Sequence, residues 1–414
     1  MRIAVVGAGI AGMASAWLLS REHEVVLYER NDYLGGHTHT HDVVIGGREY
    51  AIDTGFIVFN PPQYPLLSRM FDEIGVQSQP TTMSFSLTNR RSGLEYNATS
   101  FDGLFCQRRN LVSPRFLAMV RDILRFYRNA PALLEREDAG PRISDYLAEH
   151  RYGEAFRDDH LIPMASALWS SPTREILNFP AKYLVQFMAN HQMMQANRRP
   201  QWRVVKGGSR EYVRALRLGW RVKERTSSPV RRMRRHPNHV DVETAVGNER
   251  FDQVVMACHS DQTLALLADA SPAERDVLGA ITYQENDTVL HTDASQLPAQ
   301  RKAWAAWNAI VPIDASEQCT VSYCMNHLQS LNCAEPVVVT LNRTAHIDPS
   351  RVLKRMRYHH PLYSHASVAA QTRKPEIQGQ NRTWFAGAYW GWGFHEDGMR
   401  SAVDVARSLG VRWP

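Results

Sequence analysis

The sequence predicts an α/β protein in which a Rossmann-type nucleotide-binding domain carries an inserted α+β domain. A glycine-rich turn separates a strand from a helix within residues 2–20, and a second strand over residues 24–28 ends at an acid. A further strand, a glycine-rich loop and a helix follow one another over residues 382–409. The chain of 414 residues has room for roughly two to three domains.

The first turn has the spacing of a phosphate-binding loop, with Gly7, Gly9 and Gly12 following the apolar strand over residues 2–6. Gly7 permits the tight turn, Gly9 lets the backbone approach a pyrophosphate, and Gly12 lets helix and strand pack closely. Ile10 and Ala11 lead into the helix over residues 13–20, whose positive N-terminal end suits phosphate groups.

Glu29 lies 22 residues after Gly7, where an acid can bind ribose hydroxyls. A lone GxGxxG can be a turn that needs glycine for steric reasons alone, but two flanking strands and this acid favour nucleotide binding. The sequence has no second GxGxxG, so it predicts no separate domain for a reduced nicotinamide.

Residues 29–37, ERNDYLGGH, resemble the E-(x)5-GG extension of the glutathione-reductase-type FAD domain. They resemble more closely the amine oxidase and phytoene desaturase superfamily, in which the double glycine passes beside the cofactor pyrophosphate. This resemblance implies FAD as the cofactor and an inserted, amine oxidase-like substrate domain. It also implies cofactor contacts from Arg30, Gly35, Gly36 and His37, with His37 near the flavin.

Residues 385–399 resemble the second FAD signature of the superfamily, a Phe-Ala-Gly strand followed by a helix start. The resemblance implies cofactor contacts at Gly387, Gly398 and Met399, with the helix expected to begin near Gly398. Its dipole can stabilise negative charge on a reduced flavin. The sequence departs from the family at Ala388, where an acid that binds the cofactor is usual.

The aromatic loop and the helix start contain the candidate catalytic residues. Tyr389 and Trp392 either pack in the core or line the flavin, since large aromatic side chains do both. His395 and Glu396 are candidates for acid and base groups beside the ring, and capping of the helix is the alternative for the acid.

Two further segments resemble parts of the superfamily's FAD domain. A Gly-Gly turn at residues 207–208 precedes a helix, as in the superfamily. A strand over residues 251–258 resembles the strand that lies under the adenine in the superfamily. The resemblance also implies a cofactor contact from Val230, which precedes this strand. Lys206 beside the first turn matches only loosely the lysine that approaches flavin N5 in amine oxidases. The predicted FAD domain comprises residues 1–60, 200–275 and 378–414, and the substrate domain comprises residues 61–199 and 276–377.

The substrate domain is predicted to combine helices with a mixed sheet. After Ser113, residues 114–127 have helical amphipathic spacing with arginines on the polar face. Such a helix packs on a core more often than it rests on an anionic membrane, and the membrane alternative stays open. Residues 309–313, 319–324 and 337–341 have the alternation of strands.

Composition limits the classes of partner and the location. The net charge of +6 is spread along the chain without a nucleic-acid motif, so no nucleic acid is expected. Five scattered cysteines fit reduced thiols in the cytoplasm, and the glycine spacing argues against a cleaved signal. No apolar run is long enough to cross a bilayer, which leaves contact with the inner membrane surface as the open alternative.

A strand would place His37, His39 and His41 on one face, but no acid or cysteine accompanies them at ligand spacing, so no metal is expected.

The chain as a whole resembles a bacterial branch of predicted NAD/FAD-binding, amine-oxidase-like proteins, as in residues 83–86, 107–111 and 290–293. Members of this branch are commonly encoded beside cyclopropane fatty acid synthase-like methyltransferases. The resemblance implies an oxidoreductase that removes hydride from an apolar substrate, an unsaturated or methylated fatty acyl chain, with a lipid methyltransferase as a possible partner. A fatty-acyl double-bond isomerase, a flavin amine oxidase and a non-catalytic flavin scaffold are the alternatives.

Overall fold

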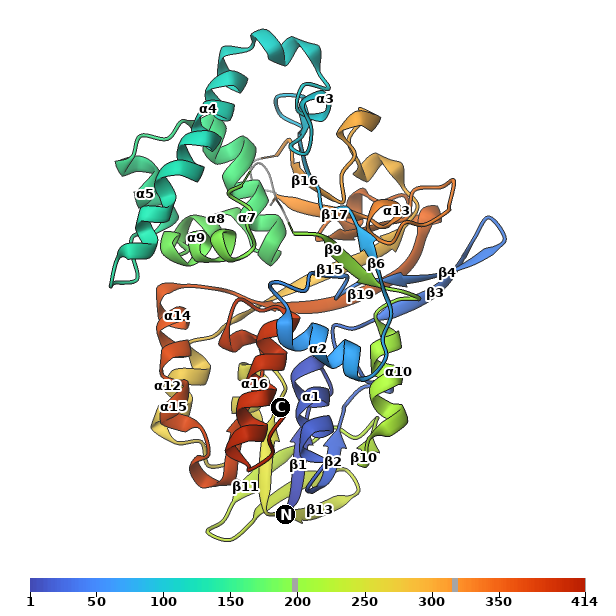
Figure 1. The fold of residues 1–414 in the computed structure, drawn as a ribbon, viewed down its shortest axis with the longest axis vertical. Coiled ribbons are helices and arrows are strands. Elements are labelled where there is room, and N and C mark those ends of the chain that lie inside the picture. Colours follow the sequence, from blue (N-terminus) through green and yellow to red (C-terminus); the bar gives the residue numbers. More distant parts are fainter. Residues whose placement is uncertain (196–199, 315–318, 414) are drawn as a thin grey trace.

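The computed structural model describes residues 1–195, 200–314 and 319–413 and places two sheets one above the other (Figure 1). The first is a five-stranded parallel sheet, which confirms the predicted Rossmann-type core. In spatial order its strands are β10 (Val222–Arg225), β2 (Glu24–Tyr28), β1 (Arg2–Val6), β14 (Gln253–Met256) and β20 (Thr383–Phe385).

Other elements cover both faces of this sheet, as expected for parallel strands whose sequences are continuously apolar. Because successive side chains alternate between faces, Ile3 and Val5 pack against helices α1 (Ile10–Leu19) and α16 (His395–Ser408). Ala4 and Val6 pack instead against the antiparallel sheet of β11 (Arg232–Arg235), β12 (Val240–Thr244) and β13 (Gly247–Phe251).

The second sheet has seven strands and is mixed, as predicted, because β16 and β7 pair in parallel and the other neighbours are antiparallel. Its spatial order is β19 (Val352–Pro361), β15 (Tyr283–His291), β18 (Val338–Leu341), β17 (Thr320–Cys324), β16 (Trp307–Val311), β7 (Phe85–Asn89) and β8 (Leu94–Asn97). Two small sheets adjoin it: β3 (Thr40–Ile45) with β4 (Arg48–Asp53), and β5 (Val58–Phe59) with β9 (Trp202–Val205) and β6 (Ser78–Thr81).

A group of helices accompanies the seven-stranded sheet at the end of the molecule opposite to the two termini (Figure 1). The predicted amphipathic helix is α4 (Pro114–Asn129), and the side chain of Ser113 caps it by accepting a hydrogen bond from the backbone N–H of Phe116. The other helices of this group are α3 (Phe101–Leu104), α5 (Ile143–Glu149), α6 (Glu154–Phe156), α7 (Ile162–Trp169), α8 (Thr173–Asn178) and α9 (Ala181–Asn190). Among the described residues, none of the helices combines the length and apolar character that spanning a bilayer needs.

The strands of each large sheet fall within the segments predicted for the corresponding domain, but two helical segments pack across the predicted boundaries. Helix α2 (Pro65–Glu73) buries Leu67, Met70 and Phe71 in the core of α1 and α16. Helices α14 (His365–Thr372) and α15 (Lys374–Ile377) pack on the other face of the parallel sheet through Ala370 and Ile377. The remaining helices are α10 (Arg210–Gly219), α11 (Ser260–Leu266), α12 (Pro272–Gly279) and α13 (Met325–Leu328).

Two expectations about local structure are corrected. Helix α16 begins at His395, three residues earlier than expected, because Asp397 accepts a hydrogen bond from the backbone N–H of Phe394 and caps the helix there. Strand β3 begins at Thr40, so His37 and His39 lie in the preceding loop rather than on one face of a strand with His41.

Candidate functional site

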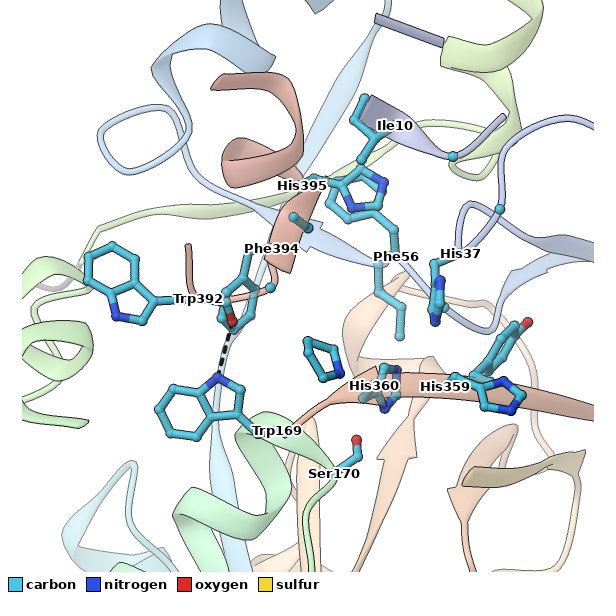
Figure 2. Close-up of a pocket in the computed structure, with 18 of the residues that line it drawn as sticks. Ile10, His37, Phe56, Trp169, Ser170, His359, His360, Trp392, Phe394 and His395 are labelled. Carbon is cyan, nitrogen blue, oxygen red and sulfur yellow. Dashed lines mark hydrogen bonds between the residues drawn. The ribbon is translucent and has the colours of Figure 1, made fainter. Parts of the chain in front are cut away.

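A cavity of about 960 Å³ extends from the first glycine turn into the space between the two sheets. One end, the nucleotide end, is lined by residues 6–11, Glu29, Arg30, Val230 and residues 257–259. The other end, the substrate end, lies among β7, β16, α7 and α9 and is lined by Phe85, Met164, Leu168, Phe187 and Trp307, among others. The middle of the cavity contains His37 and Phe56. Both lie between the turn that carries Ile10 and the strand that carries His359 and His360 (Figure 2).

The three glycines of the first turn have the geometry that their spacing predicts. Gly7 has a φ of +100°, which favours glycine, and a Cβ there would lie 2.9 Å from the backbone of Ala257. A Cβ on Gly12 would lie 1.8 Å from the carbonyl oxygen of Gly7, so this glycine lets helix and turn pack. A Cβ on Gly9 would meet no protein atom within 4 Å, and Gly9 lines the cavity. The space beside Gly9 is therefore open to a ligand.

Glu29 is held at the end of β2 by the backbone. Its two carboxylate oxygens accept hydrogen bonds from the N–H groups of Ala8 and Asn31, both at 2.9 Å. Gly36 has a φ of +59° and lies so close that a Cβ would be 2.9 Å from the Cα of Gly9. The first glycine turn, Glu29 and Gly36 thus form one continuous part of the cavity wall.

The middle of the cavity is bordered by His395 at the start of α16. Its ring stacks on Phe56 with centroids 3.7 Å apart, and its Nε2 lies 3.0 Å from Oγ1 of Thr38 and 3.3 Å from the hydroxyl of Tyr212. Burial and the neighbouring His37 lower the pKa of His395 to about 3, so its imidazole is neutral at pH 7. The contacts of Nε2 make His395 a residue that positions α16 against the cavity wall.

Sequence reasoning missed a group of histidines around His37. The ring of His37 lies 5.3 Å from that of His360 and 6.2 Å from that of His259. Burial lowers the pKa of His37 to about 4, and that of His259 and His360 to about 3. The pair of adjacent histidines at residues 359 and 360 was the sequence signal for this group. It was not sufficient, because the alternation of side chains along β19 does not show that this strand faces the nucleotide turn.

The aromatic residues of the C-terminal loop lie on the cavity wall, and one of them also packs in the core. Tyr389 and Trp392 line the cavity, and Tyr389 also belongs to the core under β1 and β14. The indole N–H of Trp169, on α7, donates a hydrogen bond of 3.1 Å to the carbonyl oxygen of Trp392 (Figure 2). This bond joins the loop before α16 to the group of helices that accompanies the seven-stranded sheet.

Five predicted site residues do not line the cavity. Glu396 points to α2, where its oxygens accept hydrogen bonds from the N–H groups of Leu66 and Leu67 at 3.1 and 3.0 Å. It therefore caps a neighbouring helix, which is against a role as acid or base beside the ring. Gly398 and Met399 lie in the contact between α16 and α1, since a Cβ on Gly398 would lie 2.7 Å from Ile10, and Met399 is fully buried there. Gly12 and Gly35 act in local packing, and Lys206, which was compared with the amine oxidase lysine, is exposed and outside the cavity.

Ala388 lines the cavity, and no acid replaces the one expected there. Glu29 is the one acidic side chain among the described residues of the lining. Outside the cavity, one group of described side chains has ligand atoms close enough to hold a metal: His236, His239 and Asp241, at the turn between β11 and β12. Arg250 lies 3.6 Å from the same aspartate.

The nucleotide end fits the ADP part of a dinucleotide. The open space at Gly9, the N-terminal end of α1 and the fixed carboxylate of Glu29 provide room for phosphates and an acceptor for ribose hydroxyls.

Three buried polar atoms along the cavity have no hydrogen-bond partner in the protein: Nε2 of His37, Nδ1 of His259 and Nε1 of Trp392. Buried polar atoms of this kind need a partner, which a bound ligand can supply.

Comparison with known proteins identifies the class to which this fold and cavity belong. Residues 10–285, well over half of the chain, match the model of the flavin containing amine oxidoreductase family, and the chain belongs to this family. It is an FAD-dependent oxidoreductase. A 102-residue segment is 29% identical to 1-hydroxycarotenoid 3,4-desaturase from Flavobacterium sp. (strain P99-3); it covers 24% of this chain and 19% of the desaturase.

Solved structures share the fold over nearly the whole chain. A putative protoporphyrinogen oxidase from Exiguobacterium sp. 255-15 and a CLA-producing fatty acid isomerase from P. acnes each give a TM-score of 0.70 at 16% identity, covering 99% of this chain and 98% of theirs. Cyclohexylamine oxidase from Brevibacterium oxydans IH-35A gives a TM-score of 0.70 at 15% identity, covering 99% of both chains. At these identities the likeness shows the fold.

Proposed function

We propose that this flavoprotein removes hydride from an apolar substrate, an unsaturated or methylated fatty acyl chain. The observation that carries the proposal is the character of the substrate end of the cavity. Met83, Phe85, Met164, Leu168 and Phe187 contribute to its wall, and the described lining has full charges only at Glu29, Arg30 and Arg357. Glu29 and Arg30 belong to the nucleotide end, and Arg357 on β19 lies 3.8 Å from both Glu285 and Asp287. The apolar side chains of the substrate end therefore suit a hydrocarbon chain.

The same observation disfavours a charged amine as substrate. Burying an ammonium group without a carboxylate partner is costly, and the one acid of the described lining already accepts two backbone hydrogen bonds at the far end. The short match to a carotenoid desaturase supports an apolar substrate as well.

The proposed step takes a hydride and a proton from neighbouring carbons of the acyl chain and leaves a carbon–carbon double bond. Bound FAD supplies the hydride acceptor. The chain's own residues exclude water, hold the acyl chain straight along the apolar wall and accept the proton. We assign the proton to His37, because this side chain lies on the cavity wall between the two ends and its Nε2 has no hydrogen-bond partner in the protein.

The test is to mix the FAD-loaded protein without oxygen with a phospholipid that has long monounsaturated chains. Loss of the flavin absorbance band, together with a product that has one more double bond, supports the proposal. A matched variant, Leu168→Trp, fills the substrate end and is expected to slow reduction by a long chain about tenfold. Its rate with a short acyl chain and its flavin content should stay unchanged. Bleaching by primary amines, and none by lipids, would overturn the proposal.

A double-bond isomerase is the second candidate, favoured by the shared fold of the fatty acid isomerase from P. acnes and by the same uncharged cavity. An isomerase would move a double bond without net loss of hydrogen. Mass spectrometry separates the two activities, because the dehydrogenase product is two hydrogens lighter than its substrate and the isomerase product has the same mass.

A further inference from the structure

Apolar side chains gather on one exposed surface far from the nucleotide end. Of the ten large apolar side chains that the described residues leave exposed, five lie within residues 101–124: Phe101, Leu111, Val112, Leu117 and Leu124. The exposed fraction is 80% for Val112, 69% for Phe101 and 61% for Leu124. We name this surface the α3–α4 surface; it lies at the end of the molecule opposite to both termini (Figure 1).

Helix α4 presents this surface as a regular stripe. Its exposed positions include Pro114, Leu117, Arg121, Leu124 and Arg128, which are spaced three and four residues apart and therefore lie on one face. Phe116, Met119 and Phe126 occupy the opposite, buried face. The helix thus has its own core contact and an additional exposed face on which leucines and arginines alternate.

The charge around the stripe is strongly positive. Residues 101–129 contain six arginines and two aspartates. One aspartate, Asp122, is buried and lies 3.7 Å from Arg121 and 3.4 Å from Arg125. The other, Asp102, is shared between Arg108 and Lys302. Arg115 pairs with the buried Asp159 at 2.8 Å, so arginines still outnumber the acids around the stripe. The exposed surface therefore combines apolar side chains with arginines, the pattern of helices that lie in the interface of an anionic membrane.

Residues that adjoin this surface in the sequence also line the cavity. Thr99, two residues before Phe101, and Tyr127 of α4 both line the cavity wall. Binding of the α3–α4 surface to a bilayer would bring this part of the wall close to the acyl chains of the lipid. A substrate with an acyl chain could then enter without crossing water, where its apolar surface is costly to expose.

We propose that the α3–α4 surface docks the protein on an anionic phospholipid bilayer, with Leu117 and Leu124 in the apolar layer and the arginines at the headgroups. The proposal rests on the acyl-chain substrate proposed above and specifies where that substrate enters. Helix α4, with 16 residues, offers a contact about 24 Å long lying parallel to the membrane plane.

The experiment measures sedimentation of the FAD-loaded protein with vesicles of phosphatidylcholine alone or mixed with phosphatidylglycerol. We expect binding to the mixed vesicles, weakened by salt, and at least tenfold weaker binding of the double variant Leu117→Asp/Leu124→Asp. The matched control is Leu218→Asp/Val246→Asp, which adds the same two charges at exposed apolar positions of the nucleotide-binding unit. Arg121→Gln/Arg128→Gln should reduce the preference for phosphatidylglycerol.

Three results would overturn the proposal: no binding by the wild type, equal loss in both aspartate variants, or a dimer of the wild type that the Leu117→Asp/Leu124→Asp variant dissociates. The last result would identify a second copy of the chain as the occupant of the surface. Flavin bleaching by detergent-dispersed phospholipid is measured on the same samples. If bleaching persists without vesicle binding, the docking proposal fails and the proposed function stands.

Discussion

Gly9 and Gly12, three residues apart in one motif, have different surroundings in this structure. Gly12 is needed by the protein itself, because a methyl group there would meet the carbonyl oxygen of Gly7. Gly9 is surrounded by open space, and its backbone has a φ of −73°, which any residue can adopt. The fold itself therefore requires Gly7 and Gly12, whereas we expect Gly9 to be required for the ligand.

We predict that Gly9→Ala folds with unchanged thermal stability after removal of FAD, but binds FAD at least tenfold more weakly, because the methyl group occupies space beside the phosphates. Gly12→Ala is the matched variant and should lower the melting temperature of the FAD-free protein by several degrees. Thermal unfolding and titration with FAD check both statements. Wild-type affinity for FAD in Gly9→Ala would contradict the assigned position of the pyrophosphate.

At the scale of elements, α16 connects three parts of the molecule through consecutive residues. His395 lies on the cavity wall, Glu396 caps α2, and Asp397 caps α16 itself. Because consecutive residues on a helix point in directions about 100° apart, one helix start can serve three different partners. Of the two neighbouring residues that were candidates for acid and base groups, His395 therefore faces the cavity and Glu396 does not.

We predict that Glu396→Gln lowers the free energy of unfolding by about 1–3 kcal/mol, since a buried pair of N–H groups loses its carboxylate. The rate of flavin reduction should change less than twofold. Asp404→Asn, at an exposed acid of the same helix, is the control and should leave stability nearly unchanged. Denaturation with urea and stopped-flow reduction measure the two effects. A large loss of rate with normal stability would restore Glu396 as a catalytic residue.

At the scale of the whole molecule, the cavity wall collects histidines from elements that are distant in sequence. Burial lowers the pKa of His37 and His191 to about 4, and of His259, His360 and His395 to about 3. The unfolded chain binds protons below about pH 6.5, whereas the folded chain keeps these imidazoles neutral. Their contribution to stability is complete above pH 6.5 and is lost as the pH falls towards 4.

Three buried acids act in the opposite direction. Burial raises the pKa of Asp53 and of Asp397 to about 6, and it raises the pKa of Glu396 as well. Their contribution to stability is present below their unfolded pKa and is lost as the pH rises through their folded pKa. Because the histidines are more numerous, the net expectation is a loss of stability on acidification below pH 6.5.

We predict that His395→Asn makes this dependence shallower, by up to about 1.4 kcal/mol for each pH unit between 6 and 4. Urea denaturation of the FAD-bound protein at several pH values measures the slope. His346→Asn, at an exposed histidine, is the control. Equal slopes for the wild type and both variants would show that His395 is not the neutral, buried group described above.

The sequence was sufficient for the features that depend on neighbouring residues. The strand, glycine turn and helix over residues 2–19, the acid at Glu29 and the capped helix after Ser113 were all predicted, because turn geometry and capping act within a few residues. The pattern of residues 29–37 resembled that of FAD proteins, and the match to the flavin amine oxidoreductase family bears out the cofactor.

Tertiary structure decided which side chains reach the cavity. Neither the capping of α2 by Glu396 nor the placing of His360 beside His37 can be read from spacing, because each contact joins residues more than 300 positions apart. The exposure of Leu117 and Leu124 was likewise undetermined, since an amphipathic pattern does not show which face a neighbouring element covers. Local sequence determined the glycine turn, its helix and the acid at Glu29, and the packing of segments distant in sequence determined which other residues line the cavity.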